Sequence, residues 1–242
     1  MCYETALTKM KSQVQEYFHS NFAFPNKFTP YYHRSGFDYP NLQIIKMDAP
    51  RVIFPAMWGY IPSWGMEDVQ GFRKKYNTLN IRSETLFNGL TTQDAQDKRC
   101  LILADGFFEP HRTGGESIPY FCYIPSTSFP DGRGLFAFAG IYSELQNEPN
   151  NLNCSMLTME ANAFFRQVHN VKKRQPVVLD ERLYDEWLNP HLKKKDVLEL
   201  IKNGFTSKEF RAHPVSPDLY RRNIDTDKPY IIEEVPPPNL LF

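Results

Sequence analysis

The sequence lacks an excess of either charge. Lysine plus arginine and aspartate plus glutamate number 28 each, so the formal net charge is zero. The net charge therefore does not indicate binding to nucleic acid, and any DNA-binding surface must be a local basic patch. Composition alone gives no reason to expect DNA.

Long apolar runs and paired cysteines are also missing. No stretch approaches the roughly 18–20 apolar residues of a membrane-spanning helix, and the start of the chain lacks the charged and apolar regions of a signal peptide. Neither a CxxC pair nor metal-ligand spacing occurs among the four cysteines, Cys2, Cys100, Cys122 and Cys154. We therefore expect reduced thiols in a cytoplasmic protein without a membrane segment, a zinc site or another metal.

What the chain does contain is enough apolar surface for a sizeable core. Hydrophobic residues make up 41% of the 242 residues and aromatic residues 14%. That length is compatible with one large domain. The 19 prolines argue against long regular elements and favour a loop-rich β core. No repeat or linker is found, and the proline-rich tail over 236–242 is expected to be extended or disordered.

Residue spacing predicts both helices and strands. The apolar residues between Thr5 and His19 recur every three or four positions, which predicts a helix. Runs rich in aromatic and β-branched residues predict strands at 42–45, 51–54, 100–104, 120–124, 135–142, 154–159 and 177–179. Further helices are expected at 161–168, at 181–188 with Asp180 as N-cap, and at 193–203 with Val197, Leu198 and Ile201 facing inward.

The chain begins with Met-Cys, which has a chemical consequence. An initiator methionine is removable when the next residue is small, so Cys2 could carry a free α-amine (pKa about 8) beside its thiol (pKa about 8.5). Such a 1,2-aminothiol condenses with an aldehyde to a Schiff base and then closes a thiazolidine ring. An interior cysteine cannot do this. The alternative is that Cys2 is an ordinary small residue near the chain end.

Two further blocks carry polar residues of catalytic type. In Asn80–Leu86, Asn80 and Arg82 point the same way if the segment is extended, and they offer an amide and a phosphate-binding guanidinium. The alternative is a polar loop in which Ser83 or Thr85 caps a helix. In Ala104–Pro110, Glu109 follows a predicted strand among aromatic residues, which favours proton transfer. The alternative is a surface glutamate at a turn.

Other blocks lie further along the chain. His169 precedes three cations, a pattern suited to proton transfer beside an anionic backbone, although a solvated basic loop remains open. The block Thr158–Asn162 comes shortly before it. Trp58–Trp64 surrounds a Gly/Pro turn with aromatic rings, either as a base-stacking wedge or as a corner of the core. For Trp58 itself we favour the core.

Together and in this order, these blocks resemble the SOS-response-associated peptidase (SRAP) family, whose members shield abasic sites in single-stranded DNA. The matching patterns are an initial Met-Cys, WGxIPxW, N-x-R-[AS]-E-T, GFxE, TxxAN, a His-led loop ending in R-x-P-V-[IV]-L, and PVSP. In this sequence they occupy Met1–Cys2, Trp58–Trp64, Asn80–Thr85, Gly106–Glu109, Thr158–Asn162, His169–Leu179 and Pro214–Pro217. Seven ordered blocks from Cys2 to Pro217 are far more specific than any one block.

The resemblance implies an α+β fold: a compact single domain, here expected over residues 1–235, around a distorted, loop-rich β-barrel with peripheral helices. It implies that Cys2 is the covalent residue, and that Asn80, Glu109 and His169 are the other active-site residues. Arg82 and Arg174 match positions that hold backbone phosphates. Trp64 and Thr158 match positions near the bound nucleotide. No cofactor or metal is implied.

Some positions depart from the family pattern. Glu4 stands where many relatives have a basic residue, so a phosphate contact from position 4 is not carried over. Pro110 replaces the usual tryptophan after the glutamate. Lys172 and Lys173 are additional residues in the His loop, and Gln175 stands where methionine is common. We expect these changes to reshape the DNA groove rather than the chemistry.

The predicted activity is covalent capture of abasic sites in single-stranded DNA by Cys2 after removal of Met1. Strand cleavage by β-elimination (AP lyase) is the expected side activity, and self-processing is the expected peptidase activity. A monomer in the cytoplasm, associated with the nucleoid, is expected. Two alternatives stay open: a cysteine peptidase that acts on proteins through Cys2, His169 and Glu109, and a non-covalent single-strand-binding module in which Cys2 is inert.

Overall fold

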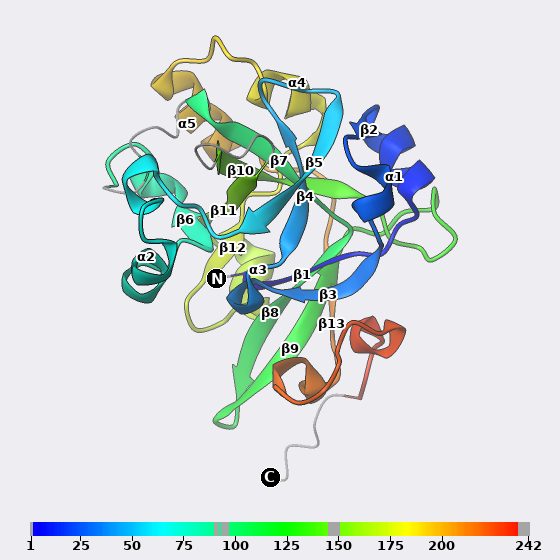
Figure 1. Ribbon diagram of the computed structural model, residues 1–242. Helices are drawn as coiled ribbons and strands as arrows, with labels where there is room; N and C mark the ends of the chain where they lie inside the picture. Colours follow the sequence, from blue (N-terminus) through cyan, green and yellow to red (C-terminus); the bar gives the residue numbers. More distant parts are fainter. Residues whose placement is uncertain (1, 90–91, 93–96, 145–150, 237–242) are drawn as a thin grey trace.

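The fold consists of two β-sheets with helices around their outside (Figure 1). The structure is a computed structural model that describes residues 2–89, 92, 97–144 and 151–236. One compact domain with mixed helices and strands confirms the predicted α+β class. The strands are β1 (Glu4–Leu7), β2 (Asn21–Phe22), β3 (Tyr31–Ser35), β4 (Asn41–Lys46), β5 (Val52–Trp58), β6 (Asn80–Arg82), β7 (Arg99–Ala104), β8 (Gly106–Thr113), β9 (Glu116–Tyr123), β10 (Phe136–Glu144), β11 (Leu152–Glu160), β12 (Arg174–Pro176) and β13 (Arg211–Pro214). The α-helices are α1 (Lys11–Phe18), α2 (Val69–Lys75), α3 (Ala163–Val168), α4 (Tyr184–Trp187) and α5 (Lys194–Asn203).

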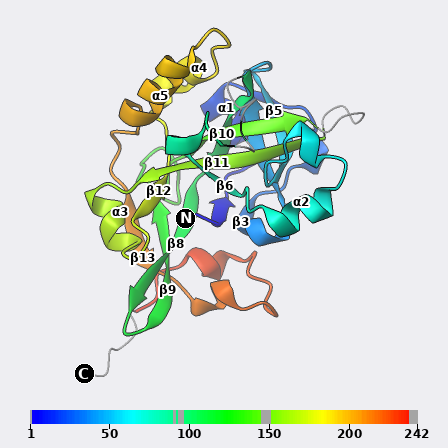
Figure 2. The same cartoon turned by 90° about the vertical axis from the view of Figure 1, so that its left-hand side faces the viewer.

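The larger sheet curls into a ring. Its strands follow the order β12-β11-β10-β7-β4-β5-β2, and β11 also pairs with β5 in parallel, Leu152 opposite Ala56. The short strand β6 pairs in parallel with the same β11, with Asn80 opposite Met156. Strand β11 therefore runs through the middle of the molecule and connects several segments that are distant in sequence (Figure 2).

The smaller sheet holds the start of the chain. Its order is β13-β9-β8-β1-β3, so β1 lies between β8 and β3 and is antiparallel to both. Glu4 lies opposite Phe108 on one side and Ser35 on the other. Hydrogen bonding on both edges fixes the position of β1, and through it the position of Cys2.

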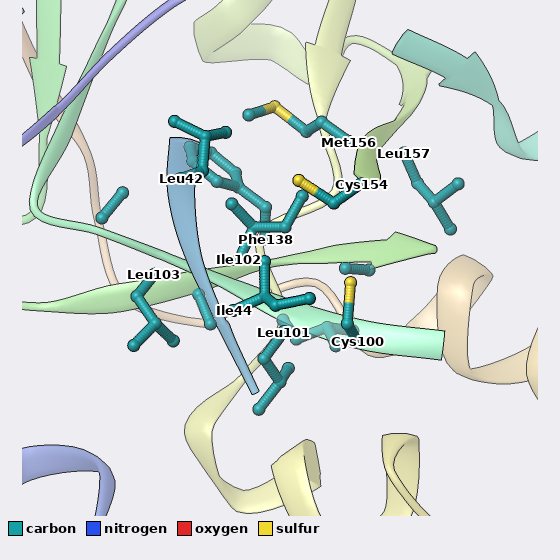
Figure 3. Packing of buried hydrophobic residues seen from close by; sticks show 14 of the residues in the cluster. Leu42, Ile44, Cys100, Leu101, Ile102, Leu103, Phe138, Cys154, Met156 and Leu157 are labelled. Carbon is teal, nitrogen blue, oxygen red and sulfur yellow. The ribbon is translucent and has the colours of Figure 1, made fainter. Parts of the chain in front are cut away.

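Apolar side chains from β4, β7, β10 and β11 pack together in the core (Figure 3). Ile44, Ile102, Phe138 and Met156 are completely buried. Each such side chain contributes on the order of 1.5–3 kcal/mol relative to full exposure. Trp58 is also fully buried, and its indole Nε1 donates to the carbonyl of Leu79 at 2.8 Å. This confirms that Trp58 is a core residue rather than a base-stacking wedge.

The predicted helix over Thr5–His19 is wrong in its first part. Residues Glu4–Leu7 form strand β1, and helix α1 starts only at Lys11. The apolar spacing fits both structures locally, but pairing with β3 and β8 satisfies the backbone of residues 4–7 on both sides. The side chain of Gln13 accepts from the backbone N–H of Met10 at 2.9 Å, which marks the true start of the helix.

Later elements agree more closely with prediction. Six of the seven expected strands correspond to β4, β5, β7, β9, β10 and β11, and α3 and α5 cover the expected helices. The segment at 177–179 makes only isolated bridges, Phe138 to Val178 and Leu179 to Phe205. Asp180 does cap its segment, accepting from Arg182 N, but a 3-10 turn precedes the short α4. In α5 the buried residues are Val197, Leu200 and Ile201. The prediction that Leu198 faces inward is wrong, because Leu198 is 44% exposed.

Among the described residues, no helix is both long and apolar enough to cross a bilayer. Of the tail predicted to be extended or disordered over 236–242, residues 237–242 lie outside the described residues.

Candidate active site

Cys2 lies two residues before β1, inside the protein. The side-chain amide of Asn80 donates to the carbonyl oxygen of Cys2 at 2.8 Å. The thiol Sγ donates to the carbonyl of Glu4 at 3.5 Å, and the residue is fully buried. Asn80 reaches this position because β6 pairs with the middle of β11. The contact between Asn80 and Cys2 therefore depends on the pairing of β6 with β11. Sequence analysis could name Asn80 and Cys2 but could not show that they meet.

Glu109 and His169 form a buried pair, and the charge of Glu109 acts on Cys2. His169 Nδ1 lies 2.9 Å from Glu109 Oε2, and the two side chains are 3% and 0% exposed. Burial raises the pKa of the Cys2 thiol, and the negative charge of Glu109 raises it further. The thiol is therefore neutral at physiological pH. The alternative, a surface glutamate at a turn, is ruled out, because Glu109 lies within β8 and is completely buried.

A glycine allows Glu109 to be this deeply buried. Gly106 begins β8, and a Cβ atom at that position would lie 2.1 Å from the ring of Phe121. No ring atom can be approached that closely, so the strand could not pack against Phe121 with any larger residue there. The glycine of the Gly106–Glu109 block thus has a packing role: it lets β8 bring Glu109 into the interior.

The loop that carries His169 is tied to the strand that carries Glu109. Asn170 accepts from the backbone N–H of Arg112 at 2.9 Å and donates to its carbonyl at 2.7 Å. Nδ1 of His111 lies 3.1 Å from the carbonyl of Val168. Sequence analysis missed both positioning residues. The available signals were that Asn170 adjoins His169 and that His111 lies two residues after Glu109, on the same face of one strand.

Arg82, Thr158 and Arg174 lie on three neighbouring strands. Thr158 of β11 is opposite Arg82 of β6 and Pro176 of β12. Arg82 is exposed, whereas Thr158 is completely buried and its carbonyl accepts from Arg174 at 2.7 Å. The structure thus brings the two arginines to one end of β11. It places Thr158 beneath Arg174 rather than at the surface.

Arg174 has a carboxylate partner that sequence analysis missed. Its Nη1 and Nη2 donate to the two carboxylate oxygens of Glu84 at 2.6 and 3.0 Å. Burial raises the pKa of Glu84, but the hydrogen bonds from Arg174, a backbone hydrogen bond and the charges of Arg174 and Arg82 together hold that pKa below its ordinary value. The sequence signal that could have indicated this ion pair was Glu84 itself, an acidic residue two positions after Arg82 in the same block. Glu84 competes with any phosphate for Arg174.

Trp64 belongs to a separate aromatic cluster. Its ring packs edge-on against Phe72 of α2 at 5.4 Å and against Tyr76 at 5.7 Å, measured between ring centroids. The indole is 49% exposed, so one face is available to a stacking partner. Its ring contacts are with α2 and the residue after it, rather than with the Cys2 cluster.

Glu4 is engaged within the protein. Its carboxylate lies 2.7 Å from Nε2 of His33, whose Nδ1 lies 2.7 Å from the hydroxyl of Thr226. Asp227 accepts from the backbone N–H of Tyr32 at 2.7 Å. The acidic residue at position 4 therefore connects β1 and β3 to the C-terminal segment.

The described residues contain no group of three or more histidine, cysteine, aspartate or glutamate side chains that could hold a metal ion. The cluster around Cys2 instead combines a thiol, an amide and a carboxylate–imidazole pair. Such a set is suited to nucleophilic chemistry with general acid–base assistance.

A buried thiol held by an amide, together with a buried carboxylate–imidazole pair in an α+β domain, defines the class as an α+β protein with a candidate thiol-based active site. Comparison with known families is more specific. The chain belongs to the SOS response associated peptidase (SRAP) family, whose model matches residues 1–221.

Curated relatives carry a consistent name. The abasic site processing protein YoqW of Bacillus subtilis is 31% identical over 162 residues, which cover 66% of this chain and 67% of that protein. The abasic site processing protein HMCES of Gallus gallus is 29% identical over 186 residues, which cover 69% of this chain and 53% of that protein.

Solved structures share the fold. A Bacteroides thetaiotaomicron protein superposes with a TM-score of 0.82 at 24% identity, covering 97% of this chain and 100% of that chain. A Bordetella bronchiseptica protein superposes with a TM-score of 0.67 at 23% identity, covering 89% of this chain and 100% of that chain. At these identities the likeness concerns the fold alone.

Proposed function

We propose that this protein processes abasic sites in single-stranded DNA by forming a covalent bond through Cys2 after Met1 has been removed. The observation that carries the proposal is that Asn80 holds Cys2 while the charge of Glu109, paired with His169, acts on the Cys2 thiol. Membership of the SRAP family and the names of the curated relatives support the choice of abasic DNA as substrate.

The proposed reaction begins with the closed ring of the abasic sugar. His169 assists its opening to the aldehyde by moving a proton at the sugar oxygen, and Glu109 pairs with the imidazole through Nδ1. Glu109 also orients the Cys2 amine and accepts and returns its protons. The neutral α-amine of Cys2 attacks the aldehyde carbon, and water leaves to give an imine. The thiol then adds across the C=N bond: sulfur bonds to carbon and its proton passes to nitrogen. The product is a thiazolidine, with one water released overall.

The hydrogen bond from Asn80 to the Cys2 carbonyl serves this sequence by holding the residue in place while its amine and thiol react in turn. The raised thiol pKa keeps sulfur protonated until the imine has formed, so the amine reacts first.

A lyase side activity follows from the same intermediate. The imine acidifies the neighbouring sugar C–H, so β-elimination can expel the 3′ phosphate and cut the strand. Ring closure by the thiol removes the imine and competes with cleavage. We further propose that the Cys2 cluster itself removes Met1, which would be the peptidase activity of this chain.

Single-stranded DNA suits this site because no base has to be unpaired before the sugar can enter. We propose that the exposed Arg82 and the Glu84-paired Arg174 hold strand phosphates, and that Trp64 stacks on a base. Thr158 contributes to DNA binding indirectly, because its carbonyl accepts a hydrogen bond from Arg174 and so positions the guanidinium. A monomer associated with the nucleoid remains our expectation.

We also propose that the domain extends to residue 235, beyond the match to the family model. Ile231 and Ile232 are buried in a cluster with Val215 and Leu219. Val235 N–H donates to the carbonyl of Pro214 at 3.0 Å. These contacts support a folded C-terminal segment that packs on the smaller sheet.

The test is an intact-mass measurement on the protein incubated with a single-stranded oligonucleotide that contains one abasic site. We expect Met1 to be absent and the mass to increase by that of the oligonucleotide minus one water. The adduct should survive boiling in detergent. An unchanged mass would refute covalent capture, and cleavage of an unrelated protein substrate by the same preparation would favour a general peptidase.

Replacing Glu84 by glutamine should strengthen binding of intact single-stranded DNA. The change releases Arg174 from its bidentate partner and removes a negative charge near Arg82. We expect the affinity to rise about threefold to tenfold at low salt, with a steeper salt dependence, because one more cation can meet a phosphate. Fluorescence anisotropy across a salt series measures both.

The matched control is Glu181→Gln, which breaks an exposed ion pair with Lys208 elsewhere on the surface. Equal DNA affinity for Glu84→Gln and the wild type would show that Arg174 does not contact the strand.

A further inference from the structure

A polar cavity away from the Cys2 site lies between β3, β4 and the 3-10 turn at Pro25–Lys27. Its volume is about 660 Å³, within the range of sites for small ligands. Lining side chains include Lys27, Thr29, Tyr31, Arg34, Asn41 and Gln43. Of the described residues that line it, two are cations and none is a carboxylate.

The guanidinium of Arg34 is the central observation. Its Nε is buried and has no hydrogen-bond partner, although the residue as a whole is half-buried. By contrast, the Nε of the fully buried Arg99 donates to the carbonyl of Trp187. A buried N–H without an acceptor is costly, because it has lost its hydration. Arg34 is therefore poised for an acceptor that comes from outside the chain.

Two buried neutral groups line the same cavity. Tyr31 is 1% exposed, and its hydroxyl is buried without a hydrogen-bond partner. Burial raises the pKa of Tyr31, so the hydroxyl stays protonated and can donate. The guanidinium of Arg34 lies 5.0 Å from the centroid of the Tyr31 ring, which fixes the two donors beside each other. Gln43, 6% exposed, adds an amide.

We propose that this cavity binds a phosphoryl anion, which accepts hydrogen bonds from Arg34 and the Tyr31 hydroxyl and is drawn by the charge of Lys27. A guanidinium with a planar set of donors matches phosphate oxygens. The anion is either a free nucleotide or a backbone phosphate of a DNA strand, and the experiment below separates the two.

The cavity is distinct from the Arg174 site. It adjoins Leu152, at the first residue of β11, whereas Thr158 and Arg174 lie near the last. Those six residues of extended strand span roughly 20 Å. The inference does not depend on the chemistry of Cys2.

Binding is measured by calorimetry and by thermal unfolding, with inorganic phosphate, thymidine 5′-monophosphate and an intact single-stranded oligonucleotide as probes. We expect saturable binding to the wild type and a higher unfolding midpoint with ligand. Arg34→Gln should weaken that binding about tenfold. The matched control is Arg211→Gln, an exposed arginine on β13, which should bind as the wild type does.

The probes identify the source of the anion. Binding of the mononucleotide at the wild-type cavity, lost in Arg34→Gln, indicates a free nucleotide. An Arg34-dependent loss of oligonucleotide binding without mononucleotide binding indicates a strand phosphate. Absence of saturable binding of any probe to the wild type would overturn the proposal, as would equal affinity of the wild type and Arg34→Gln.

Tyr31→Phe separates ligand binding from folding. Removing an unpartnered buried hydroxyl should leave the unfolding midpoint in phosphate-free buffer equal to or above that of the wild type. The same change should weaken anion binding severalfold. If Tyr31→Phe instead destabilises the free protein and leaves anion affinity unchanged, the hydroxyl has a structural role and is not a ligand donor.

Discussion

Replacing Cys2 by alanine is expected to abolish the boiling-resistant adduct with abasic DNA while leaving a reducible imine. Alanine is small enough for the initiator methionine to be removed by a cellular aminopeptidase without the Cys2 cluster, so the variant still offers an α-amine with which the aldehyde can condense. The ring cannot close without sulfur, and the imine either hydrolyses or undergoes β-elimination. We therefore expect strand cleavage by Cys2→Ala to exceed that of the wild type. Denaturing gels with and without borohydride measure adduct and cleavage together.

Cys122→Ala is the matched control for that variant. Both thiols are fully buried, and in both the pKa is raised by burial and then by the charge of Glu109. Only Cys2 can acquire a free α-amine, so the Cys122 variant should crosslink as the wild type does. A stable adduct that persists in Cys2→Ala, or is lost in Cys122→Ala, would place the covalent chemistry on another residue.

Most strands could be predicted from sequence because the residue types within each segment are sufficient to favour a strand. Aromatic and β-branched runs between Gly and Pro identified β7, β9, β10 and β11. The N-terminal residues could not be assigned in this way, since their structure depends on distant partners. Thr5 donates to the carbonyl of Gly106, 101 residues away. No local pattern contains that information, and tertiary pairing overrides the helical spacing.

The candidate site shows the same division. The residue types and their order along the chain named Cys2, Asn80, Glu109 and His169. The structure joins Asn80 to Cys2 and Glu109 to His169, and the charge of Glu109 acts on Cys2. What sequence could not provide was the partner of each group. From the sequence alone, Arg174 was predicted to be available to a phosphate. In the structure Glu84, 90 residues away, accepts two of its hydrogen bonds. The availability of a charged side chain depends on such pairs, which only the fold defines.

Replacing Glu109 by glutamine should slow adduct formation by about 10²–10⁴, the usual contribution of a positioned acid or base. The carboxylate lies 2.9 Å from His169 Nδ1 and is completely buried, so water cannot replace it. Glutamine keeps the shape and removes the charge. His169 then loses the carboxylate that orients it, and the amine of Cys2 loses its proton acceptor. Adduct formation followed by quenched gels over time gives the rate.

A thiol-reactivity measurement distinguishes this role from a structural one. The negative charge of Glu109 raises the pKa of Cys2, so its removal lowers that pKa toward the ordinary value. At a given pH a larger fraction of the thiol is then ionised, and alkylation of Cys2 by iodoacetamide should become faster while crosslinking becomes slower. Glu116→Gln, an exposed change on β9, should alter neither rate. If Glu109 only supported the fold, its loss would expose the buried Cys2 thiol, so alkylation would also become faster, but the unfolding midpoint would fall. Opposite changes in the two rates at an unchanged unfolding midpoint indicate a carboxylate that both opposes ionisation of the thiol and transfers protons during capture of the aldehyde.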